Sequence, residues 1–272
     1  MNKSIFNRFR DIAYEKAGIS LSEQKKELVS ARVAKRQRAL NIADVSDYLN
    51  YLESANNNDE IVHFLDAIST NFTHFMREKS HFDLLQDELQ LWRARGHDRL
   101  RIWCAASSSG EEPYSLAITV LDSFGGVLPN ARILATDINT TVLAQASLGE
   151  YNGKSLEALT RAQRANYFER LTERRKSAED SRYRVKKNVR ELLVFKRLNL
   201  AKIPYPMNGP LDFVFCRNVM IYFDRVVRQR LITEVERLLI PGGLLMIGHS
   251  ETLAGLTTGL KALKPSVYKK MA

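Results

Sequence analysis

Hydrophobic residues in the first ninety positions recur every three or four residues, as Ile5, Phe9 and Ile12 show. This spacing is typical of amphipathic helices. Ser22 is predicted to cap the second helix, and a later helix is predicted from about residue 59 to residue 68. No strand is indicated here, so the chain is expected to begin with a small all-α domain.

Beyond residue 100 the pattern changes, because short apolar runs alternate with helical stretches. The predicted strands are RIWCAA, ARILATDI, LLVFKRLNL, LDFVFCRNV, PGGLLMIGHS and a final edge strand VYKKM. Such alternation predicts an α/β domain with a mostly parallel sheet wrapped by helices. Ligands of these sheets bind beyond the carboxyl ends of the strands, where the unusual segments of this sequence lie.

Residues 150–195 fit the alternation poorly and are rich in Arg, Lys and Glu. Tyr183 to Val185 is the only short strand predicted in them. We interpret this stretch as a small subdomain inserted into the α/β domain. No internal repeat or low-complexity tract is visible.

Composition adds limits to this picture. Hydrophobic residues make up 44% of the 272 residues, which is enough for a packed core. No apolar run reaches the roughly 18 residues that span a membrane, and the charged N-terminus lacks the apolar core of a signal peptide, so a cytoplasmic location without membrane insertion is expected. Cys104 and Cys216 lie in apolar runs and are expected to be reduced and buried. The five histidines show no HExxH-like spacing, so no metal site is predicted.

The net charge of +10 is unevenly distributed. Residues 161–202 contain 14 Lys and Arg against five Asp and Glu, and residues 25–38 contain six basic residues against Glu27. This balance predicts an acidic partner, such as a nucleic acid, an anionic lipid or an acidic protein surface.

The segment SSSGEEPYS resembles a nucleotide-binding loop between a strand and a helix, yet it has one glycine, Gly110, followed by Glu111 and Glu112. Carboxylates at this place would repel a pyrophosphate, and neither GxGxxG nor GxxxxGK[ST] is present. The loop therefore favours a nucleoside that carries a positive group and no phosphate. S-adenosylmethionine (SAM) has these properties. The alternative role of the two glutamates is favourable charge in a first helical turn.

Three further segments carry candidate site residues. Asp137 ends the second predicted strand, where an acidic residue can accept hydrogen bonds from ribose hydroxyls; its alternative role is to cap the next helix. In FVFCRNVMIYFD, Asn218 is a candidate ligand contact, and Tyr222 either places its hydroxyl near a reacting group or packs as an ordinary aromatic residue. In ISTNFTHFMREKSHF, Thr73 is predicted to be a helix N-cap with Arg77 just inside, either as a solvated charge or as a fork for a carboxylate.

Taken together, these motifs resemble the CheR family of chemotaxis receptor methyltransferases. The resemblance covers nearly the whole chain in the family's order, and GEEPYS and FCRNVMIYF are its most specific parts. It implies an all-α N-terminal domain over residues 1–75 and a Rossmann-like SAM-dependent methyltransferase domain over 76–272, with the β-subdomain inserted at about 150–195.

The resemblance also implies the activity and its residues. SAM would donate a methyl group to glutamates in the cytoplasmic region of chemotaxis receptors, giving methyl esters and S-adenosylhomocysteine, with no metal and with a monomeric enzyme. Arg77 and Tyr222 match positions near the methyl acceptor. The cofactor contacts carry over to Asn71, Thr73, Arg77, Glu112, Asp137, Asn199, Leu200, Asn218 and Val219.

A basic helix over residues 22–40 is the predicted docking site for the glutamate-rich receptor helices, with a solvated helix face as the alternative. Its docking residues are Arg32, Lys35, Arg36 and Arg38. The inserted region lacks the glycines of family members whose β-subdomain binds a receptor tether and has Arg174-Arg175-Lys176 instead, so tether binding is not predicted.

Two other functions compete with this interpretation. A nucleic-acid methyltransferase would suit the basic insert, but the chain lacks an NPPY-like motif and aromatic residues among its basic ones, so no nucleic acid is expected. A non-catalytic SAM-binding module would retain the cofactor residues but would not need Arg77 and Tyr222.

Overall fold

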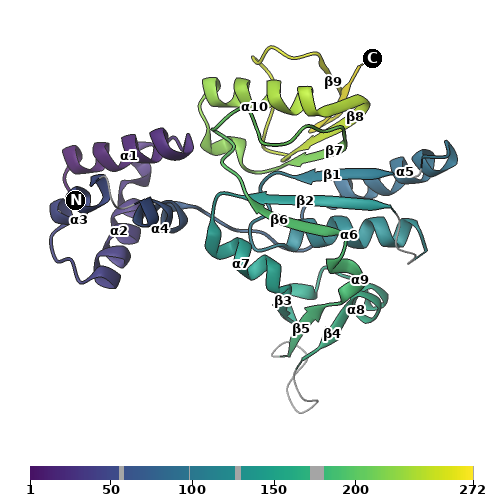
Figure 1. Ribbon diagram of the computed structural model, residues 1–272, viewed down its shortest axis with the longest axis horizontal. Coiled ribbons are helices and arrows are strands. Elements are labelled where there is room, and N and C mark those ends of the chain that lie inside the picture. The colour runs from purple at the N-terminus through teal and green to yellow at the C-terminus, as the bar shows by residue number, and fades with distance from the viewer. Residues whose placement is uncertain (55–57, 98, 126–129, 172–180, 272) are drawn as a thin grey trace.

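The computed structural model describes residues 1–271 apart from 55–57, 98, 126–129 and 172–180. A helical N-terminal part lies beside a larger α/β part (Figure 1). None of the helices in the described residues is long and apolar enough to cross a membrane.

The N-terminal part packs four helices around one apolar cluster. The helices are α1 (Lys3–Ala17), α2 (Lys26–Leu40), α3 (Val45–Glu53) and α4 (Asn58–Ile68), with a short 3₁₀ turn η1 (Glu23–Lys25) before α2. Phe9 is fully buried between the rings of Tyr48 and Phe64, with centroid distances of 5.9 and 5.5 Å. Ser22 precedes the 3₁₀ turn and makes no side-chain capping bond there.

The segment that follows enters the α/β part without forming the helix start predicted at Thr73. Helix α5 begins later and spans Ser80–Ala94. The prediction was wrong because Met76 and Glu78 have positive φ angles of 54° and 56°. A right-handed helix cannot pass through such residues, so the backbone turns twice here and points side chains toward the sheet.

The α/β part is built on a seven-stranded sheet with the order β6-β2-β1-β7-β8-β10-β9, which confirms the predicted fold class. Five strands are parallel neighbours and the last two are antiparallel. Their bounds are β1 (Leu100–Cys104), β2 (Ala131–Asp137), β6 (Leu193–Arg197), β7 (Leu211–Cys216), β8 (Leu239–Ile247), β9 (Leu260–Lys264) and β10 (Val267–Lys270).

Helices cover both faces of this sheet. Ile102 and Cys104 of β1 join one apolar cluster with α5 and α6 (Glu111–Ser123), while Trp103 between them joins a second cluster with α10 (Arg225–Leu238). This alternation follows from the two-residue period of a strand. Helix α7 (Thr140–Leu148) follows β2, and the short helix α9 (Lys187–Arg190) precedes β6.

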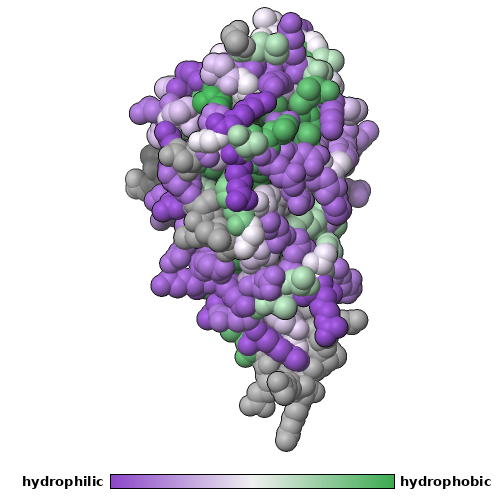
Figure 2. Space-filling model, turned by 90° about the vertical axis from the view of Figure 1, so that its right-hand side faces the viewer, coloured by the Kyte–Doolittle hydropathy of each residue, from purple (hydrophilic) through white to green (hydrophobic). Residues whose placement is uncertain are grey.

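The C-terminal strand is not the edge strand that the sequence predicted. Strand β10 pairs with β8 on one side and with β9 on the other, so β9 forms the edge. The five-residue sequence LKALK mixes lysine with apolar residues and was not predicted as a strand; four of its five residues are exposed. On the face that carries the ends of β9 and α5, hydrophilic residues dominate the surface (Figure 2).

The inserted region forms a separate three-stranded antiparallel sheet with the order β3-β5-β4. Its elements are β3 (Glu150–Asn152), the 3₁₀ turn η2 (Lys154–Leu156), α8 (Arg161–Tyr167), β4 (Phe168–Arg170) and β5 (Arg182–Val185). The predicted strand at Tyr183 is the central one. Arg174, Arg175 and Lys176 lie outside the described residues.

Candidate active site

A pocket lies where the carboxyl ends of β1, β2, β6 and β7 meet the helical part. All nine predicted cofactor contacts line it, together with Tyr222 and Arg32. Further lining comes from Lys25 and Leu28 on η1 and α2, Phe72 after α4, and Ile138 and Leu198 beyond β2 and β6. The pocket thus joins the end of the sheet to the basic helix.

The loop after β1 forms one wall and uses small residues for a close approach of its backbone. Ala105, Ala106 and Ser108 line the pocket. Gly110 has φ of 101°, and a Cβ there would lie 2.6 Å from the Tyr151 hydroxyl, so only glycine fits before α6 begins. The single remaining glycine of this loop is therefore required by its backbone conformation and by packing.

Asp137 ends β2 and turns its carboxylate toward this loop. Its Oδ2 accepts the Ser108 N–H at 2.8 Å, and its Oδ1 accepts the Asn139 N–H at 2.9 Å. Helix α7 is instead capped by the side chain of Asn139, which accepts from Val142 N. Burial raises the pKa of Asp137, and the backbone N–H donors oppose the rise. Each carboxylate oxygen keeps a lone pair for a further donor.

Glu111 and Glu112 have different environments although they are adjacent. The Glu112 carboxylate lines the pocket and pairs with the Arg217 guanidinium, with 2.7 Å between Oε2 and Nη1. Burial raises the pKa of Glu112, while Arg217 favours its charged form. Glu111 is not a lining residue and accepts the Ser109 hydroxyl at 2.7 Å. Both are buried in the first turn of α6, where negative charge is favoured.

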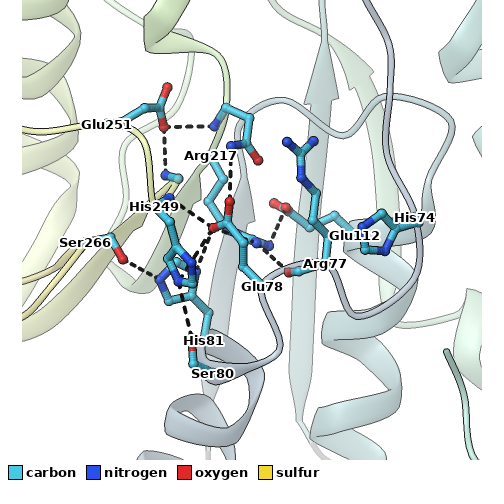
Figure 3. Close-up of polar contacts among 12 residues, drawn as sticks. His74, Arg77, Glu78, Ser80, His81, Glu112, Arg217, His249, Glu251 and Ser266 are labelled. Carbon is cyan, nitrogen blue, oxygen red and sulfur yellow. Dashed lines mark hydrogen bonds and ion pairs between the residues drawn. The ribbon is translucent and has the colours of Figure 1, made fainter.

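Arg217 follows β7 and is completely buried as a side chain. Besides Glu112, its guanidinium contacts Glu78, with 3.0 Å between Nη2 and Oε2, and donates to the Arg77 carbonyl oxygen at 2.5 Å (Figure 3). Two carboxylates therefore balance this one buried cation. The arrangement connects the wall at α6 with the turn that precedes α5.

Asn218 lies in the turn after β7 and adopts the left-handed conformation, with a φ of 57°. Its N–H donates to Glu251 Oε2 at 2.8 Å, and its side-chain amide donates to Glu78 Oε1 at 3.2 Å. Glu251 also accepts from Gly248 N at 2.7 Å and from Ile221 N at 3.2 Å. This carboxylate thus holds the turn in the strained left-handed conformation that directs Asn218 and Val219 to the pocket.

Arg77 lies at the pocket wall and is not a helical residue. Its Nη1 donates to the Phe72 carbonyl oxygen at 2.8 Å, and its guanidinium lies 5.9 Å from the centroid of the Phe72 ring. In the described part of the chain Arg77 forms no ion pair. Most of its five N–H donors therefore remain available to an incoming carboxylate.

Tyr222 closes the short 3₁₀ turn η3 (Met220–Tyr222) and is half-buried at the pocket. Its ring lies beneath the Lys25 ammonium, 4.8 Å from the centroid. Its carbonyl oxygen accepts the Ser20 N–H at 2.8 Å. The helical part and the α/β part therefore meet at the residue that was predicted to act near the methyl acceptor.

Two further predicted cofactor contacts, Asn199 and Leu200, follow β6. Asn199 donates its side-chain amide to the Lys16 carbonyl oxygen at 2.6 Å and accepts from Ala201 N at 2.9 Å. Leu200 is buried beside it. These bonds anchor the C-terminal end of α1 to the loop that lines the pocket.

The four predicted docking residues on α2 are not equivalent. Arg32 lines the pocket and donates to the Ala67 carbonyl oxygen at 2.8 Å, while Lys35 and Arg38 are exposed. Arg36 forms a bidentate pair with Glu60 at 2.9 and 2.7 Å, and Glu60 is only 4% exposed. Arg36 is thus paired within the helical part, and it stays a docking prediction with fewer free donors than Lys35 and Arg38.

Sequence reasoning did not identify Glu78, His81 or His249 as parts of the site. His81 is buried against the network around Arg217, and its pKa is lowered to about 4 by burial and by that guanidinium. The pKa of Glu78 is lowered as Arg217 outweighs the effect of its burial. The sequence contained one signal, the Glu-x-x-His spacing of Glu78 and His81. His249 could not be associated with them because it lies 168 residues after His81.

Comparisons with known proteins agree with this architecture. A family model described as "CheR methyltransferase, all-alpha domain" matches residues 4–69, and one described as "CheR methyltransferase, SAM binding domain" matches residues 71–269. The chain is 38% identical to a chemotaxis protein methyltransferase of Escherichia coli over 263 residues, covering 97% of this chain and 89% of the relative. It is 34% identical to one of Borreliella burgdorferi, covering 99% and 95%.

Among solved structures, a SAM-dependent methyltransferase of Methanosarcina mazei is similar at a TM-score of 0.33 and 19% identity, over 56% of this chain and 52% of that one. The two family models span nearly the whole chain in succession, and the relatives are similar over almost their full length. The chain therefore belongs to the CheR methyltransferase family.

Proposed function

We propose that this protein transfers a methyl group from SAM to glutamate side chains of chemotaxis receptors, giving glutamate methyl esters and S-adenosylhomocysteine. The observation that carries the proposal is one pocket that joins the carboxylates of Glu112 and Asp137 to the cationic groups of Arg77 and Lys25, neither of which forms an ion pair among the described residues. The names of the relatives, chemotaxis protein methyltransferases, support a receptor as the acceptor.

The pocket residues fit SAM. Asp137 retains acceptor capacity for ribose hydroxyls, and Glu112 provides negative charge near an ammonium or sulfonium group. Ile138, Leu198 and Leu200 provide apolar surface for a purine ring. The loop after β1 contains no lysine that would favour a phosphate. The residues proposed to hold the cofactor are Asn71, Thr73, Arg77, Glu112, Asp137, Asn199, Leu200, Asn218 and Val219.

When bound, SAM supplies an activated methyl group. The acceptor glutamate needs no general base, because a carboxylate with a reference pKa of about 4.3 is already a nucleophile at neutral pH. The protein therefore has to align the acceptor and exclude water. We assign the alignment to Arg77, whose free donors can hold the acceptor carboxylate, and to the Tyr222 hydroxyl, which can bond its second oxygen.

Orientation is a better role for Arg77 than charge neutralisation. A tight ion pair would stabilise the acceptor carboxylate before reaction, when it carries its full charge, more than in the transition state, when that charge is being lost. The guanidinium is held at one edge by the Phe72 carbonyl, which fixes its plane. A fixed plane restricts the direction from which a carboxylate approaches.

The exposed cations of α2 are proposed to dock the receptor. Lys35→Glu with Arg38→Glu is expected to lower the rate of receptor methylation at low salt by about tenfold and to weaken its dependence on salt, since steering by opposite charge is screened by ions. Initial rates at several salt concentrations measure this. Lys261→Glu with Lys264→Glu on the edge strand β9 makes a control with the same change in charge, because both lysines are exposed and neither lines the pocket.

An unchanged rate and salt slope in that double variant would remove α2 from docking. Arg36 is left in place in this experiment, because its replacement would leave the buried Glu60 carboxylate without its cation.

The function is tested by incubating the protein with methyl-labelled SAM and cytoplasmic fragments of the host's receptors. Label that enters the receptor and is released by mild base identifies a carboxyl methyl ester. Base-stable label, or label in added DNA or RNA, would contradict the proposal, and cofactor binding without transfer to any fragment would favour a non-catalytic module. We propose that the reaction takes place in the cytoplasm and that the protein acts as a monomer.

A further inference from the structure

Glu78, His81 and His249 form a cluster behind the pocket that the methyl transfer reaction does not use. Their potential ligand atoms all lie within 4.8 Å of one another. Glu78 and His81 stand three residues apart around the start of α5, and His249 follows β8 (Figure 3). Glu78 lies in the turn before α5 with a φ of 56°, so this turn, and not a helical face, brings its carboxylate to His81.

The hydrogen bonds of His81 determine which of its nitrogens has a free lone pair. Its Nε2 lies 2.8 Å from the Ser266 hydroxyl oxygen, and that hydroxyl donates its single hydrogen to the Pro265 carbonyl at 2.7 Å. In that arrangement Nε2 is the donor to Ser266. In the neutral ring the lone pair is consequently on Nδ1.

That Nδ1 lone pair is directed at a carboxylate. His81 is 2% exposed, and within the described residues its Nδ1 has no hydrogen-bond partner. The nearest charged atom on its side is Glu78 Oε2, at 3.6 Å. A cation between Nδ1 and this oxygen would interact favourably with both, which makes the space between them a possible ion site.

His249 completes the cluster from the solvent side. Its Nε2 is 3.9 Å from Glu78 Oε2 and 3.3 Å from the Ser80 hydroxyl, and the two imidazole rings meet edge to face at 4.8 Å. The His249 side chain is 51% exposed, so an ion can reach the cluster from solvent. Ligands at 2.0–2.1 Å around a tetrahedral ion stand roughly 3.4 Å apart, so only small shifts are needed.

The surrounding bonds match those of a metal site. His81 donates its other nitrogen to a hydroxyl that is itself bonded to a carbonyl, which fixes the ring orientation. The Glu78 carboxylate is oriented by the Asn218 amide at 3.2 Å and by Arg217 at 3.0 Å. Partners of this kind hold metal ligands in place before the ion arrives.

We propose that Glu78, His81 and His249 bind a divalent transition-metal ion, with Zn²⁺ as the best chemical match. Two imidazoles and one carboxylate suit Zn²⁺, and water would fill a fourth position. Mg²⁺ and Ca²⁺ are poor matches because they prefer oxygen ligands. The proposed metal site does not involve the methyl acceptor, so it can be tested independently of the proposed function.

Metal binding at this site is coupled to the cofactor pocket. Glu78 contacts both Arg217 and Asn218, which line the pocket, so an ion on Glu78 competes with Arg217 for the same oxygen. By linkage, the ion and the cofactor then change each other's affinity by the same factor. We expect each to weaken the binding of the other, because the ion takes a Glu78 oxygen that otherwise holds Arg217 at the pocket wall.

The test uses untagged full-length protein freed of metal with a chelator, titrated with Zn²⁺ by calorimetry and with Co²⁺ by visible absorption. The wild-type chain is expected to bind one ion. His249→Ala is expected to weaken binding by about tenfold or more, and it leaves the buried His81 in place. His63→Ala is the control, since His63 is exposed on α4. The absence of saturable one-to-one binding, or equal affinity in His249→Ala and wild type, overturns the proposal.

Titration with S-adenosylhomocysteine tests the coupling. A Zn²⁺ concentration that saturates the wild-type chain but not His249→Ala is expected to weaken its binding to the wild-type chain by about fivefold, a typical coupling, and to change it little in His249→Ala. Equal affinities with and without Zn²⁺ in the wild-type chain would show that the ion does not reach Arg217 through Glu78. Failure of receptor methylation would not affect either titration.

Discussion

Arg77→Ala is expected to lower the turnover number at saturating SAM by more than about tenfold, because the acceptor carboxylate loses the fork that orients it. Arg77 contributes no ion pair to the described part of the chain, and its one side-chain bond is to the Phe72 carbonyl. The loss of stability should therefore be small. Steady-state rates at saturating SAM and receptor fragment measure the effect.

Arg77→Lys separates geometry from charge. Lysine keeps the cation but not the planar fork, so turnover in this variant should stay well below that of the wild type. Arg95→Ala is the matched control, because Arg95 is exposed at the end of α5. Wild-type turnover in Arg77→Ala would remove this residue from the mechanism.

Glu112→Ala is expected to reduce the free energy of unfolding by about 3 kcal/mol, because it takes one partner from a buried ion pair. The Glu112 carboxylate accepts from Arg217 at 2.7 Å and from the Cys104 thiol at 3.2 Å. Arg217 keeps Glu78 as a partner, which places the loss at the lower end of the range for broken buried pairs. Urea unfolding of the variant and the wild type, both without ligand, measures this difference in the free energy of unfolding.

The same variant should bind S-adenosylhomocysteine at least about tenfold more weakly, since the carboxylate contributes the negative charge of its wall and a lost charged hydrogen bond costs about 1.5–3 kcal/mol. Glu234→Ala is the control: Glu234 is also buried and paired, with Arg237 at 2.8 Å, but it lies outside the pocket lining. That control should lose stability and keep its affinity. Wild-type affinity in Glu112→Ala would exclude Glu112 as a cofactor contact.

Local patterns were sufficient for much of the fold. The strands at Ile102, Ile133 and Val214 were predicted because buried parallel strands read as short apolar runs. The helix start at Thr73 was wrong, since Met76 and Glu78 nearby have positive φ angles, which leave no mark on hydrophobic periodicity. The edge strand β9 was missed because its exposed residues have no apolar pattern.

For the candidate site, too, local patterns predicted some residues correctly and missed the contacts between distant ones. Asp137 and Asn218 could be selected because each stands where an apolar strand ends, and parallel strands bring such ends together. Arg36 was assigned to docking because a run of basic residues does not show which of them meets an internal carboxylate. Glu60, which binds it, is 24 residues away. Charge on a helix predicts a surface, but ion pairs across helices depend on how the helices pack.

The sequence by itself determined the fold class, the family, the cofactor and the set of residues around the pocket, because these depend on residue types at the ends of strands and on motifs that are local in the chain. Only the tertiary structure decided which charges are free and which are paired. It joined Arg217 to Glu112 and Glu78, paired Arg36 with Glu60, and brought His249 to Glu78 and His81. Pairing energy depends on distance and burial, and both are set when distant segments pack against each other.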